Sequence, residues 1–133
     1  MSHKATLTIT ALLTILFSSF HLADDVVRGI EPGGTSNYIG ILIVAVFLYA
    51  TLMLGERRWA HVIVLLLSLG SAAVPYLHMT GSGLVSPKVL NAGAVFFWVW
   101  TLLALGATAL VSVVLSAQRL WSIQRGHRGV RII

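Results

Sequence analysis

Four long stretches of apolar residues follow one another along the chain, and none of them contains Asp, Glu, Lys or Arg. They run over Ala5–Leu22, Tyr38–Leu54, Ala60–Leu77 and Leu90–Ala117. A helix needs ~20 apolar residues, with a rise of about 1.5 Å each, to cross the hydrocarbon core of a bilayer. The pattern therefore predicts four transmembrane helices, at about 5–23, 38–54, 60–77 and 90–118.

The polar connections between these stretches are short, so residues 1–133 are expected to form a single transmembrane domain. A short connection makes consecutive helices antiparallel neighbours. We therefore expect an all-α membrane protein, an antiparallel four-helix transmembrane bundle. The first stretch has an alternative interpretation as a cleaved signal peptide, because Lys4 gives it a basic start. Residues 18–23, however, offer no pair of small residues suited to cleavage.

The basic residues are distributed unequally between the two ends of the predicted helices. If the helices alternate in direction, only Arg28 and Lys88 lie on one side, and the other side holds seven basic residues, which are Lys4, Arg57, Arg58, Arg119, Arg125, Arg128 and Arg131. Basic residues in short loops favour the cytoplasmic side. We expect a multi-pass protein of an inner or plasma membrane, with both termini and the basic tail 119–133 in the cytoplasm.

The composition is that of a membrane protein, and it limits the sites and the partners that can be expected. The mean hydropathy is +0.91, and 57% of the residues are hydrophobic while only 10% are charged. The absence of cysteine excludes disulfides, thiolate metal sites and cysteine nucleophiles. The basic tail is expected to contact anionic lipid headgroups of the bilayer, and no nucleic-acid partner is needed to explain it.

Small hydroxyl residues recur every four positions in the first and fourth stretches. They are Thr6, Thr10, Thr14 and Ser18 in the first, and Thr108, Ser112 and Ser116, after Ala104, in the fourth. Such a spacing places side chains on one face of a helix. Small residues let membrane helices approach closely, so we interpret both faces as packing surfaces. The alternative is a hydroxyl-lined path, which would normally require an ionisable residue at depth.

One group of polar residues is a candidate metal-binding site. Alternating helices bring His21 and His78 to the same outer edge, together with Asp24 and Asp25. A histidine and a carboxylate three or four positions apart share a helical face and can bind a divalent metal. Asp24 and Asp25 cannot point the same way, so at most one of them should join His21. The competing interpretation is an interfacial surface, with Asp24 paired to Arg28 four residues later.

Three further interpretations stay open, one for this edge and two for the whole protein. His21 and His78 could be the axial ligands of a haem, with the aromatic residues 96–100 as its wall. In the simplest interpretation the protein has no catalytic role and acts through helix contacts, as a homo-oligomer or as an accessory subunit of a membrane-protein partner. A small transporter or channel is a third possibility. The sequence contains no recognised catalytic motif, so an enzyme is the less favoured expectation.

Overall fold

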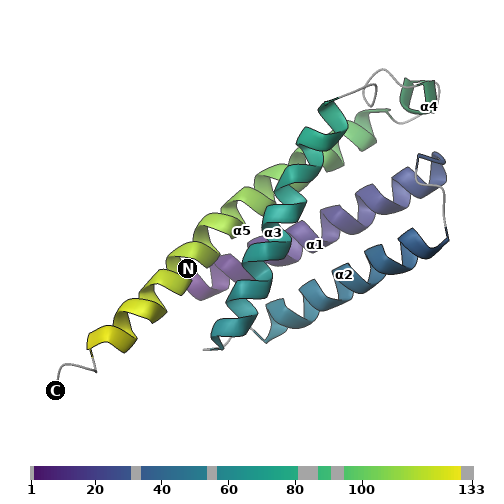
Figure 1. Cartoon of the computed structure of the whole chain (residues 1–133). Coiled ribbons are helices and arrows are strands. Elements are labelled where there is room, and N and C mark those ends of the chain that lie inside the picture. Colours follow the sequence, from purple (N-terminus) through teal and green to yellow (C-terminus); the bar gives the residue numbers. More distant parts are fainter. Residues whose placement is uncertain (1, 31–33, 54–56, 81–86, 91–94, 130–133) are drawn as a thin grey trace.

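The computed structural model describes residues 2–30, 34–53, 57–80, 87–90 and 95–129. All secondary structure in these ranges is helical: α1 (His3–Val27), α2 (Thr35–Leu52), α3 (Arg58–Met79), α4 (Pro87–Leu90) and α5 (Val95–Gly129). The four long helices form one bundle, in which α5 packs against both α3 and α1 (Figure 1). Helix α2 packs against α1 and α3.

Helix α1 has a defined start and a defined end. The hydroxyl of Ser2 accepts a hydrogen bond from the backbone N–H of Ala5 at 3.2 Å, which caps the first turn. Gly29 has φ +64°, a conformation that glycine adopts without strain and that ends a helix. The N–H of Ile30 then donates to the carbonyl of Asp25 at 2.9 Å. This turn fixes the backbone around Asp25 at the end of α1.

Helices α3 and α5 approach each other closely around Pro75. A methyl group added to Gly106 would lie only 2.8 Å from Pro75 Cγ, so the contact depends on the missing side chain of glycine. Pro75 lies inside α3, which continues to Met79. The sequence left open whether Pro75 would kink or end this helix, and the structure shows that it does not end it.

In the described part of the chain, two apolar clusters form the core: one contains Val89, Trp98 and Leu102, and the other lies where α1, α2 and α3 meet. This second cluster contains Leu7, Ala11, Ile15, Phe47, Ala50 and Val64. The first residues of α1 lie against the second half of α5, because His3 Nε2 is 3.0 Å from Gln118 Oε1. The last turns of α1 lie against the first turns of α5, where His21 Nδ1 is 3.4 Å from Thr101 Oγ1. Together these contacts tie α1 to α5 over most of its length.

Within the described residues, three helices are long and apolar enough to cross a membrane: α1, α3 and α5 over Val95–Arg125. The second predicted span corresponds to α2, whose apolar part Asn37–Leu52 is shorter. The fourth predicted span, 90–118, begins at the end of α4, and the long helix itself begins at Val95. We expected the tail to lose helical structure at Gly126, but α5 continues to Gly129 and extends beyond the other helices (Figure 1).

The hydroxyl residues of α1 and α5 behave mainly as packing residues. Thr14 Oγ1 donates to the carbonyl of Thr10 at 2.9 Å, and Thr108 Oγ1 donates to that of Ala104 at 2.9 Å. Ser112 and Ser116 are fully buried. His61, in the first turn of α3, is buried, with only 1% of its surface exposed. The start of α3 therefore turns this imidazole into the bundle.

Candidate metal centre

His21 and His78 lie against each other at the end of the bundle where α1 and α3 end. Their ring centroids are 4.9 Å apart, and the rings meet edge to face. His21 is buried, with 3% of its surface exposed, whereas the His78 side chain is 25% exposed. The two histidines meet because the C-terminal ends of α1 and α3 lie at the same end of the bundle.

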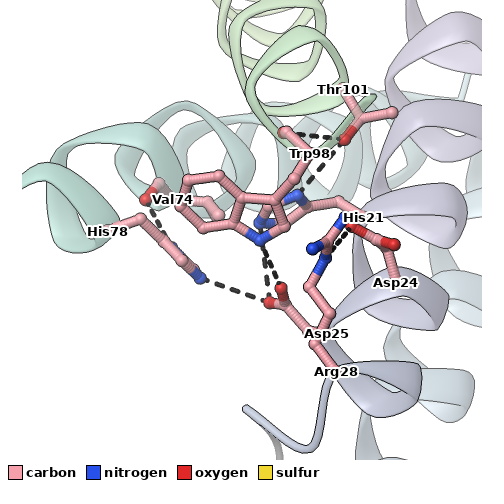
Figure 2. Close-up of polar contacts among 8 residues, drawn as sticks. All are labelled: His21, Asp24, Asp25, Arg28, Val74, His78, Trp98 and Thr101. Carbon is pink, nitrogen blue, oxygen red and sulfur yellow. Dashed lines mark hydrogen bonds and ion pairs between the residues drawn. The ribbon is translucent and has the colours of Figure 1, made fainter. Parts of the chain in front are cut away.

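Asp25 completes the group. One oxygen of its carboxylate, Oδ2, lies 3.5 Å from His21 Nε2 and 3.3 Å from His78 Nε2. One donor atom from each of the three residues can be chosen so that all three atoms lie within 4.8 Å of one another. Asp24 lies apart from this group, because its Oδ2 forms an ion pair with Arg28 Nε at 2.7 Å (Figure 2). The structure thus places Asp25, and not Asp24, beside the two histidines.

Helix α5 contributes two residues that sequence analysis did not single out for this site. The indole Nε1 of Trp98 donates a hydrogen bond to Asp25 Oδ1 at 2.7 Å. The Trp98 ring is completely buried and lies 5.5 Å from the His21 ring and 5.7 Å from the His78 ring, between centroids. Thr101, one turn later, contacts His21. The neighbouring Phe96 and Trp100 are exposed and stack on each other, so only Trp98 of the aromatic residues 96–100 forms a wall of this site.

The hydrogen-bond partners determine which nitrogen of each imidazole carries the proton. His78 Nδ1 lies 3.0 Å from the carbonyl oxygen of Val74, which can only accept, so Nδ1 must donate. The hydroxyl of Thr101 donates to the carbonyl of Trp98 at 3.0 Å, so Thr101 is left to accept from His21 Nδ1. These contacts assign the proton of each neutral imidazole to Nδ1. The Nε2 atoms of both histidines face Asp25 Oδ2. A protonated His78 donates to this oxygen from Nε2 at 3.3 Å, whereas a neutral His78 presents a lone pair there that can bind a cation.

Three acceptor atoms that converge in this way repel one another unless a proton or a cation lies between them. Zinc binds imidazole nitrogen and carboxylate oxygen at about 2.0–2.2 Å, so tetrahedral ligands are about 3.4 Å apart. The two measured separations, 3.3 Å and 3.5 Å, match that spacing. The Nδ1 atoms of His21 and His78 contact Thr101 and Val74. Hydrogen bonds of this kind, from the ring nitrogen that does not bind the metal, orient metal-binding histidines.

A cavity of about 380 Å³ opens onto the group. His21, Asp25 and His78 line it, together with apolar residues of α2 and α3. The protein therefore combines a cluster of potential metal ligands with space for a small molecule. Comparisons with protein-family models, with curated proteins and with solved structures gave no match.

Proposed function

We propose that the protein is an integral membrane protein that binds one divalent transition-metal ion through His21, Asp25 and His78. The observation that carries the proposal is the convergence of the Nε2 atoms of two histidines on one carboxylate oxygen. Buried ionisable groups in membrane helices are costly to maintain, so they usually serve a function. A bound cation would remove the repulsion between the three acceptor atoms.

The ligand set favours a metal with open coordination positions. Two histidines and one carboxylate hold catalytic zinc and non-haem iron(II) in other proteins, and a water or a substrate occupies the remaining positions. A haem held by both histidines fits less well, because a macrocycle would have to lie between them. Their rings are in edge contact, with centroids 4.9 Å apart, and Asp25 Oδ2 lies within 3.5 Å of both Nε2 atoms.

The test is metal binding by the purified protein in detergent. We expect one Zn²⁺ or Co²⁺ per chain and a rise in thermal stability on loading, because a ligand that binds only the folded state stabilises it. His78→Ala and Asp25→Asn should each weaken binding at least ~10-fold. Asp24→Asn is the matched control, because Asp24 is adjacent and pairs with Arg28. Equal binding by all three variants would refute this site.

The proposed topology places the metal at the outer face and both termini in the cytoplasm. The distribution of basic residues supports this orientation. Reporters fused to the C-terminus should therefore be cytoplasmic, and reporters inserted at Gly34 should be external. The second external position, Gly81–Gly83, lies outside the described residues. A cytoplasmic signal from either insertion would contradict the topology.

Association through helix contacts is a second proposal, with a second copy or another membrane protein as the partner. The exposed apolar face of α2 supports it, because Ile39, Leu42 and Tyr49 are each more than half exposed. Light scattering that gives the protein mass within the detergent complex distinguishes an oligomer from a monomer.

The tail is also proposed to bind anionic lipid headgroups. In this tail the guanidinium of Arg125 lies 4.9 Å from the centroid of the Trp121 ring.

A further inference from the structure

The cavity beside the metal ligands is elongated along α3. Its lining on this helix extends from Leu66 to His78, and twelve residues of helix correspond to about 18 Å. His78 lies at one end of this line, beside His21 and Asp25, and Leu66 lies at the other. The cavity therefore has a polar end, formed by the three ligands, and a long part that is apolar except for Ser18 and Ser71.

The apolar part opens on the side of the bundle. Ile43 of α2 and Leu66 of α3 both line the cavity, and they are 47% and 60% exposed on the outer surface. Helices α2 and α3 meet near their connection and separate toward the end that holds the site (Figure 1). A molecule dissolved in the bilayer can enter the cavity by this side.

The charge of the proposed metal site and the volume of the cavity restrict which ligands can bind. A divalent ion with one carboxylate and two neutral imidazoles has a net charge of +1, which favours an anionic group at the open coordination position. The volume of about 380 Å³ is near the lower limit of ~300 Å³ for small-molecule sites. That volume suits one apolar chain better than the two chains of a phospholipid.

We infer that the cavity binds a single-chain amphiphile whose anionic oxygen head group coordinates the metal while its apolar chain lies along α3. This inference rests on the proposed metal site. Carboxylate and phosphate heads share the required chemistry, so decanoate and decyl phosphate are the two probes. Acetate and inorganic phosphate are their controls without a chain.

The experiment uses the Co²⁺-loaded protein, because the visible spectrum of Co²⁺ changes when a ligand enters its coordination sphere. Decanoate or decyl phosphate should change the spectrum at concentrations at least ~10-fold lower than acetate or inorganic phosphate, since each buried methylene contributes to affinity. Whichever of the two chain-bearing probes acts at the lower concentration identifies the preferred head group. Equal effects with and without the chain would overturn the inference and leave the metal site intact.

Gly70→Leu tests the location of the chain. Gly70 lines the cavity, and a Cβ added there meets nothing within 4 Å, so a side chain at this position can begin without a clash and occupy cavity space. The variant should bind Co²⁺ as the wild type does and lose the preference for long chains at least ~10-fold. Leu69→Phe is the control, because Leu69 is 48% exposed and lies outside the cavity lining. An unchanged chain preference in Gly70→Leu would overturn the inference, and absence of Co²⁺ binding by the wild type would overturn both proposals.

Discussion

Trp98 and Asp25 are joined by a hydrogen bond of 2.7 Å between the indole Nε1 and the carboxylate Oδ1. This bond connects α5 to α1 and occupies one of the two carboxylate oxygens. The other oxygen, Oδ2, is left to face the two histidines. Trp98 thus orients the carboxylate in the proposed metal site, although indole itself is not a metal ligand.

Replacing Trp98 with phenylalanine should therefore weaken metal binding while retaining most of the buried aromatic surface. Removing a partner of a metal ligand commonly lowers affinity about 10- to 100-fold, and we expect a loss in this range by Co²⁺ titration. Trp100→Phe is the matched control, because Trp100 is 54% exposed. An affinity that stays at the wild-type value in Trp98→Phe would show that this hydrogen bond does not position the carboxylate.

Metal binding should depend on pH. A histidine binds a metal through an unprotonated nitrogen, so protons compete with the ion, and free imidazole titrates near pH 6.5. Lowering the pH from 7.5 to 5.5 should weaken Co²⁺ binding about 10- to 100-fold, since two imidazoles must lose protons. His78→Ala should show a shallower dependence, because only one imidazole remains. Binding that is unaffected by pH would indicate that the histidines are not the ligands.

The sequence was sufficient to predict that His21 and His78 lie at one end of the bundle. This prediction requires only the number and the order of the apolar stretches. It also restricted the carboxylate to Asp24 or Asp25. The choice between these two depends on the rotation of α1 about its axis, which is determined by packing against α5. Trp98 was missed for the same reason, since it appeared among four neighbouring aromatic residues and only the packed structure shows which one points inward.

Ser112 provides a test of packing between the helices. It is fully buried, and its hydroxyl has no hydrogen-bond partner among the described residues. Ser112→Leu should lower the free energy of unfolding by about 1–3 kcal/mol, because the added atoms overpack the interior. Ser112→Ala should be neutral or stabilising, since it removes a buried polar group without a partner. Thermal unfolding in detergent measures both, and a destabilising Ser112→Ala would show that the hydroxyl is bonded.

The control position for this test must be chosen from the structure. Leu115 is unsuitable, because it is partly buried and packs against the core cluster of Leu7 and Val64. Val114, which is 53% exposed, is the better choice. Val114→Ala should change thermal stability less than Ser112→Leu.

The contact between α5 and α3 predicts opposite effects on stability for alanine substitutions at two helical glycines. A Cβ at Gly106 would lie 2.8 Å from Pro75 Cγ, whereas a Cβ at Gly70 meets nothing within 4 Å. In a helix, alanine is favoured over glycine by about 1 kcal/mol, so Gly70→Ala should raise thermal stability. Gly106→Ala has the same helical advantage, but the proline ring is rigid and the two helices must separate. We expect it to lower the free energy of unfolding by about 1–3 kcal/mol. If the two variants have equal stability, the close approach of α3 and α5 at Pro75 is refuted.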